Sequence, residues 1–181
     1  EKRIKGYSIK PINKHEKNVY DLLYMIEQQY DRDKFPYVYQ SILSIQKGQT
    51  KSLIQQKGLS SPFEHNILSI SAEKGGTSVL ADAYLVNGDI TNYCSDFIFG
   101  FGFLLQLIDD LQDVSADLAS SHMTIFSQTA HKWKLDNITN KLISFSINTL
   151  NSESYLQLSG ATHLKDLILN NIFMLIFEAI S

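Results

Sequence analysis

The stretch FIFGFGFLLQLIDDLQD, residues 97–113, decides the fold that this sequence predicts. Its first two thirds are apolar on nearly every side, which is typical of a helix at the centre of a bundle. Its last third places one amide and three carboxylates at positions i, i+3, i+4 and i+7 of one helical face, namely Gln106, Asp109, Asp110 and Asp113. We therefore expect a central helix over residues 92–117 that carries a cluster of acids.

The three carboxylates of this cluster repel one another unless a cation or water lies between them. Oxygen ligands without histidine or cysteine suit Mg²⁺, which takes one or two protein carboxylates together with phosphate oxygens and waters. The pattern predicts that Asp109, Asp110 and Asp113 bind Mg²⁺ and hold a diphosphate. The alternative interpretation is a solvated helix end whose acids face water.

The rest of the chain also predicts helices, so we expect an all-α fold. Its three prolines and nine glycines stand mostly where helices should begin or end. Apolar residues recur at helical spacing in further segments, which we place at 13–30, 36–58, 62–88, 136–150 and from 162 onward. The third segment, which Pro62 would open, is interrupted by Gly75 and Gly76, where we expect a bend or close packing.

Length and composition favour one globular domain. With 181 residues, of which 44% are hydrophobic, the chain can bury a sizeable core, and we expect residues 1–181 to form a single all-helical domain. A net charge of −3 predicts no nucleic-acid partner. The single cysteine, Cys94, favours a cytoplasmic location. The most apolar stretch, 167–180, is too short to be a transmembrane segment, and we expect a buried C-terminal helix there.

Several short motifs occur in the order in which trans-polyprenyl diphosphate synthases carry them. Gly48-Gln49 is followed by Lys74-Gly75-Gly76-Thr77, and then by residues 102–113, which contain Q-x-x-D-D-x-x-D. Residues 117–124, DLASSHMT, are similar to the D-L-x-x-G-K-x-T segment of that family. From Glu73 to Phe126 the chain thus resembles the second half of a class I isoprenoid synthase.

The resemblance implies a role for each matching residue. Lys74 and Thr77 would contact diphosphate oxygens, and His122 stands where the family has a phosphate-binding lysine. Gln106 would lie by the allylic substrate, and Gln49 would belong to the helix that lines the pocket. The second aspartate-rich motif of the family, which binds Mg²⁺, would be formed by Asp109, Asp110 and Asp113.

The same resemblance implies an isoprenoid (terpenoid) synthase-type helical bundle. Its activity would be the Mg²⁺-dependent ionisation of an allylic isoprenoid diphosphate, followed by chain elongation with isopentenyl diphosphate, in a homodimer. The first aspartate-rich motif of the family is missing from this sequence. Since the sequence begins with Glu1 rather than methionine, we expect a truncated bundle that lacks N-terminal helices.

Two alternatives stay open. The missing first motif also fits a non-catalytic subunit of isoprenoid-synthase fold, or an interaction protein, that regulates or completes a partner enzyme. A terpene cyclase shares the ionisation step, but cyclases usually carry an N-D-x-x-S-x-x-x-E pattern that this sequence lacks. Prenyl transfer with chain elongation is therefore the favoured reaction.

Overall fold

The computed structural model describes residues 1–58, 64–152 and 162–180, and every regular element in these ranges is a helix. The all-α expectation is thereby confirmed, whereas the isoprenoid synthase type of bundle stays a prediction. The helices are α1 (Lys14–Gln29), α2 (Pro36–Ser52), the 3₁₀-helix η1 (Leu53–Lys57), α3 (Ile67–Asn87), α4 (Asn92–Gln112), α5 (Val114–Ser120), α6 (Ile125–Ala130), α7 (Asp136–Leu150) and α9 (Thr162–Ile180). No helix in the described ranges is both long and apolar enough to cross a membrane.

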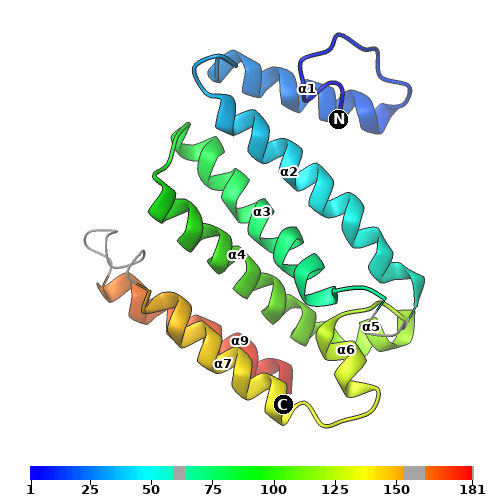
Figure 1. Ribbon diagram of the computed structural model, residues 1–181, viewed down its shortest axis with the longest axis vertical. Coiled ribbons are helices and arrows are strands. Elements are labelled where there is room, and N and C mark those ends of the chain that lie inside the picture. Colours follow the sequence, from blue (N-terminus) through cyan, green and yellow to red (C-terminus); the bar gives the residue numbers. More distant parts are fainter. Residues whose placement is uncertain (59–63, 153–161, 181) are drawn as a thin grey trace.

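Three long helices, α2, α3 and α4, form a layer in which each lies beside the next (Figure 1). The helix α1 lies at the outer edge of this layer, next to α2, and α7 and α9 pack against α4 on its other side. The short helices α5 and α6 lie at the end of the layer where α2 ends, α3 begins and α4 ends (Figure 1). Segments that are far apart in the sequence therefore meet at this end.

Local signals explain where several helices begin and end. The side chains of Asn13 and Asn66 each accept a hydrogen bond from a backbone N–H three residues later, at the starts of α1 and α3. Pro36 occupies the first turn of α2, where its missing N–H is not needed. Gly88 ends α3 with a φ of 75°, a backbone conformation that residues other than glycine rarely adopt.

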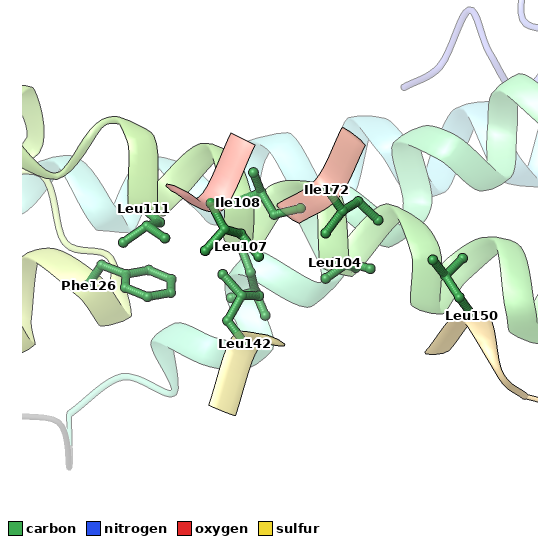
Figure 2. Close-up of a cluster of buried hydrophobic side chains, with 9 residues drawn as sticks. Leu104, Leu107, Ile108, Leu111, Phe126, Leu142, Leu150 and Ile172 are labelled. Atoms are coloured by element: carbon green, nitrogen blue, oxygen red, sulfur yellow. The ribbon is translucent and has the colours of Figure 1, made fainter. Parts of the chain in front are cut away.

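The hydrophobic core forms around the C-terminal half of α4, as expected for a central helix. Leucine and isoleucine side chains of α4 meet side chains from α6, α7 and α9 (Figure 2), and the buried set includes Leu104, Leu107, Ile108, Leu111, Phe126, Leu142, Leu150 and Ile172. Burying one such side chain contributes about 1.5–3 kcal/mol to stability. This cluster fixes α4 against the C-terminal helices and leaves its other faces for α3.

Glycines bring α3 and α4 into backbone contact. A Cβ atom built on Gly75 would collide with the carbonyl oxygen of Gly102 and lie 2.5 Å from Cβ of Gln106. A Cβ built on Gly76 would lie 2.6 Å from the ring of Phe99. Of the two expected reasons for these glycines, a bend or close packing, close packing is confirmed, and α3 continues as one helix through both.

Two other expectations about helices need correction. The predicted helix over 92–117 ends at Gln112, because the chain turns at Asp113, and α5 follows as a separate short helix. The C-terminal helix α9 is half-buried rather than buried: Ile176 faces the core, whereas Phe177 is exposed. Pro62, where we expected a helix to begin, lies outside the described residues.

An ion-pair network attaches the N-terminal segment to α1. Arg3 donates two hydrogen bonds to the carboxylate of Glu27, at 2.6 and 2.5 Å, and Arg32 donates another at 2.6 Å. Arg32 also donates to the backbone oxygen of Ile4 at 2.7 Å, and its guanidinium lies 3.9 Å from the ring centroid of Tyr39. The hydrogen bonds from Arg3, together with those from Arg32, hold the pKa of Glu27 at about 2.

We predict that Gly75→Ala destabilises the fold, because the new methyl group would force α3 and α4 apart. The expected loss in the free energy of unfolding is about 2–3 kcal/mol, measured by urea denaturation. Gly100→Ala is the matched control: it lies in α4, and its added Cβ would meet nothing within 4 Å. The free energy of unfolding of this control should stay the same or rise by up to about 1 kcal/mol. Equal destabilisation of both variants would contradict the close contact between Gly75 and α4.

We also predict that Glu27→Gln lowers the free energy of unfolding at pH 7 by about 2–3 kcal/mol. A carboxyl whose pKa is lowered on folding stabilises the folded state above its unfolded pKa. For Glu27 this contribution is lost as the pH falls from 4.5 to about 2. Urea denaturation of the unaltered protein and of Glu27→Gln, at several pH values in this range, measures the difference in their free energies of unfolding. This difference should vanish at the lowest pH. Glu178→Gln, an exposed change in α9, should show no such pH dependence.

Candidate functional site

Three hydrogen bonds organise the carboxylates at the C-terminal end of α4. Nε2 of Gln106 donates to Oδ1 of Asp110 at 2.8 Å and to Oδ2 of Asp109 at 3.2 Å. From α3, the hydroxyl of Ser71 donates to Oδ2 of Asp110 at 2.9 Å. The glycine contact between α3 and α4 brings these side chains within reach of one another. Gln106 and the first two aspartates of the motif therefore form one connected group.

Asp110 is buried, with only 5% of its surface exposed. Burial raises the pKa of this carboxyl, whereas the hydrogen bonds from Gln106 and Ser71 and the charge of Lys74 lower it, and the net pKa lies above the ordinary value. The nearby charge of Asp109 raises the pKa further. Asp110 is therefore a carboxylate that the fold holds in place at an electrostatic cost.

Lys74 is the cation at the centre of this arrangement. It lies half-buried on α3, one turn after Ser71, and its charge acts to lower the pKa of Asp110 on α4 and of Asp117 on α5. The charge of a single ammonium group therefore acts on carboxylates of two other helices. The role that the resemblance implies for Lys74, contact with diphosphate oxygens, stays a prediction.

Asp117 extends the acidic cluster onto α5. Burial raises its pKa, the charge of His122 and a hydrogen bond from the Thr124 side chain lower it, and the charge of Asp113 raises it again. His122 is half-buried and follows Ser121, which adopts a left-handed conformation with a φ of 57°. The turn after α5 thus places His122 near Asp117, with Asp113 at the junction of α4 and α5.

Backbone contacts hold the turn that carries His122. The backbone N–H of Met123 donates to the carbonyl oxygen of Gln55 at 2.7 Å, and Nε2 of Gln55 donates to the carbonyl oxygen of Met123 at 2.9 Å. The hydroxyl of Ser127 donates to the carbonyl oxygen of His122 at 2.7 Å. Gln55 of η1 is almost fully buried, so this two-way clamp fixes the turn against the end of α2.

A groove of about 250 Å³ starts at the carboxylates and runs between α3 and α4. Gln106 and Asp109 line its polar part, and Val79 and Leu105 supply apolar side chains. Glycines of the interhelical contact form much of its floor, which lets a ligand approach the backbone. The groove could take an apolar chain whose charged end lies near Asp109.

Two predicted substrate-binding residues, Thr77 and Gln49, lie outside the hydrogen-bonded group of Gln106, Asp109 and Asp110. The hydroxyl of Thr77 donates to the backbone oxygen of Glu73 at 2.6 Å, and a Cβ built on Gly48 of α2 would lie 3.1 Å from this hydroxyl. Gln49 is exposed on α2. In the described part of the chain, no hydrogen bond joins either side chain to the carboxylates. Their substrate-binding roles stay predictions.

Sequence reasoning missed three residues of this region. Ser71 had a usable signal, because it stands three positions before Lys74 on the same helical face. Asp117 begins the DLASSHMT segment, but the resemblance of this segment to the family implied no role for it. Gln55 had no signal, since its contact joins residues 68 positions apart in the sequence.

The carboxylates differ in how well they suit Mg²⁺. Asp109 and Asp113 are exposed and one helical turn apart, so both can offer oxygens to a metal ion. Both oxygens of Asp110 already accept hydrogen bonds, which does not favour metal binding. Within the described residues, no group of three or more histidine, cysteine or acidic side chains is arranged to hold a metal. Mg²⁺ would therefore need further oxygens from a ligand, and its binding here stays a prediction.

We predict that Asp110→Asn increases the free energy of unfolding at pH 7. Because folding raises the pKa of Asp110, the native protein loses stability as the pH rises from the ordinary carboxyl pKa towards the raised one. An asparagine avoids this loss and can still pair with Gln106 and Ser71. Urea denaturation from acidic to neutral pH should show the stability gap growing with pH.

Asp110→Ala is the control for this prediction. It leaves the donors of Gln106 and Ser71 without their acceptor, and it should lower the free energy of unfolding by about 1–3 kcal/mol. An asparagine variant that loses stability relative to the native protein as the pH rises would contradict the raised pKa of Asp110.

Comparison of the chain with protein-family models, curated proteins and solved structures gave no match. The chemistry of the site therefore has to be inferred from its own residues: a lysine of α3 among carboxylates of α4 and α5, beside a partly apolar groove.

Proposed function

We propose that this chain binds an allylic isoprenoid diphosphate together with Mg²⁺, as a class I isoprenoid synthase of the chain-elongating, polyprenyl diphosphate synthase type. The position of Lys74 carries the proposal. Its charge lowers the pKa of two carboxyls on other helices, Asp110 on α4 and Asp117 on α5. A groove that Val79 and Leu105 line in part also has Asp109, the neighbour of Asp110, in its lining. A diphosphate attached to an apolar chain has the complementary chemistry.

The charge balance of the cluster supports a bound cation. Two cationic side chains, Lys74 and His122, lie near four carboxylates, those of Asp109, Asp110, Asp113 and Asp117. Even when both cationic side chains are charged, the four carboxylates outnumber them. A divalent cation offsets this charge, and a diphosphate supplies the oxygens that the protein does not.

Each residue has a distinct role in this proposal. Asp109 and Asp113 hold Mg²⁺ through exposed carboxylates, and Lys74 binds diphosphate oxygens. His122 adds a donor from the clamped turn when it is protonated. Asp110 is a positioning residue, because it accepts hydrogen bonds that hold Gln106 and Ser71 in place. Bound Mg²⁺ would neutralise charge that develops on the leaving diphosphate.

The groove between α3 and α4 receives the apolar chain in this proposal. Its volume of about 250 Å³ equals roughly eight water-sized groups at about 30 Å³ each, which suits the first one or two isoprene units. Val79 and Leu105 contact the chain in this proposal, and water displaced by the bound substrates leaves an allylic cation to meet the alkene of isopentenyl diphosphate rather than hydroxide. Chain elongation is the reaction that follows.

One observation favours a second function, a non-catalytic subunit of isoprenoid-synthase fold. The carboxylate of Asp110 is buried and fully engaged by Ser71 and Gln106, an arrangement that stabilises helix packing without any metal. A subunit of this kind would keep the α3–α4 contact and bind a partner enzyme. It would release no diphosphate from an allylic substrate, and this separates the two functions.

Thermal unfolding with geranyl or farnesyl diphosphate tests the proposal. A ligand that binds only the folded state raises the melting temperature. We expect a rise only when Mg²⁺ and the diphosphate are both present. Asp109→Ala should abolish this rise, and because the side chain is exposed, stability without ligand should change by less than about 0.5 kcal/mol. Asp96→Ala, which removes an exposed carboxylate of the same helix, should keep the full effect.

Three results would decide against parts of the proposal. Mg²⁺-dependent binding that survives Asp109→Ala would contradict the metal assignment. Absence of any ligand-induced rise in the unaltered protein would contradict the diphosphate site. Binding without release of inorganic diphosphate, in the presence of isopentenyl diphosphate, would favour the non-catalytic subunit.

A further inference from the structure

A separate apolar cavity lies on the other flank of α4. It has a volume of about 220 Å³, and of the nine described residues that line it, eight are apolar. Phe103 and Leu107 contribute from α4, Ile138 and Phe145 from α7, and Leu68 from the start of α3. Wall atoms of this kind offer a ligand dispersion contacts and no hydrogen bonds, so the cavity suits a hydrocarbon chain.

The charged residue at this cavity is Lys141 of α7. Its side chain is exposed, and within the described ranges it forms no ion pair. A lysine can lay its methylene stem along an apolar wall while its ammonium group stays in water. Lys141 therefore places a positive charge at the opening of a hydrocarbon-lined cavity.

A polar hollow of about 360 Å³ adjoins the cavity and shares Lys141 and Phe145 with it. Its other lining residues all carry amide or hydroxyl groups, namely Asn137, Asn140, Ser144 and Asn148. These residues recur at helical spacing and form one face of α7. Among the residues that the structure describes, no acidic residue lines either the cavity or the hollow. The face thus combines one cation with several neutral donors.

This region is distinct from the site proposed for diphosphate. The groove between α3 and α4 is lined by Gly75, Gln106 and Asp109 among others, and none of its described lining residues also lines the cavity or the hollow. On α4 the two regions use neighbouring but different faces, since Phe103 and Leu107 are each one position away from groove residues. Binding in one region does not require the other.

We propose that the cavity and the adjoining hollow form a binding site for a single-chain amphiphile with an anionic head. The chain occupies the apolar cavity, which holds roughly seven water-sized groups at about 30 Å³ each. The carboxylate or phosphate head lies at Lys141, where the amides of α7 donate further hydrogen bonds. Charge complementarity selects an anion over a neutral or cationic head of the same length.

Isothermal titration calorimetry on the full chain tests this site with decanoate, decyl phosphate and uncharged decanol, each below its aggregation limit. We expect saturable one-to-one binding of both anions. The tighter of the two identifies the head group, carboxylate or phosphate. Ile138→Trp fills the cavity and should weaken all three ligands by about tenfold or more, whereas Ile147→Trp, a control on α7 outside the cavity, should leave the affinities unchanged.

A second pair of variants tests the head group. Lys141→Met should weaken both anions by about threefold to fivefold, as for an exposed ion pair, without weakening decanol. Lys132→Met is the control, because Lys132 is also exposed but lines neither the cavity nor the hollow. It should change the affinity for neither the anions nor decanol.

The proposal is overturned if binding does not saturate, if Ile138→Trp leaves the affinities unchanged, or if Lys141→Met weakens decanol as much as the anions. Circular dichroism checks that each variant keeps its helices. If Ile138→Trp does not fold, Leu68→Trp fills the cavity from α3, where the native side chain is partly exposed, and the same criteria apply.

Discussion

The structure depends on the backbone contact between α3 and α4 at Gly75 and Gly102. Without Cβ atoms at these positions, the two helices approach closely enough for the Ser71 hydroxyl to reach Asp110 at 2.9 Å and for Lys74 to act on carboxylates of α4 and α5. A larger interhelical distance would break this hydrogen bond and widen the groove that runs along the contact. The glycines cost helix stability locally, and the packing that they allow offsets this cost.

The same contact places a carboxylate where it is electrostatically unfavourable. Asp110 is buried beside Asp109, and its pKa is raised despite the donors of Ser71 and Gln106. The buried leucine and isoleucine side chains of α4 offset this penalty. Burial of each one contributes more to the free energy of unfolding than a typical hydrogen bond contributes. A helix anchored so firmly on its apolar side can hold its acids in fixed positions. This arrangement is expected of a site that must be preorganised for a charged ligand.

Much of the fold and the first part of the candidate site could be predicted from spacing within single helices. The i, i+3, i+4, i+7 pattern grouped Gln106 with its aspartates, and apolar periodicity located the long helices. The turn at Asp113 could not be predicted, because the residues around it are compatible with a continuing helix. Three further residues could not be assigned for a related reason. Ser71 and Gln55 act through contacts across 39 and 68 positions of sequence, respectively. Asp117 meets its neighbours across a turn whose geometry the local residues do not determine.

The α4 helix also explains how two chemically different cavities can lie so close together. Successive residues of a helix point about 100° apart, so Gln106 lines the groove beside Asp109 while Leu107 lines the apolar cavity. The two faces share one rigid backbone, which is held on one side by the glycine contact and on the other by α7 and α9. A ligand that moves α4 by even a fraction of an ångström on the cavity side would shift the carboxylates relative to Lys74. Close packing in the core resists such shifts, and it is therefore this packing that keeps the two cavities independent.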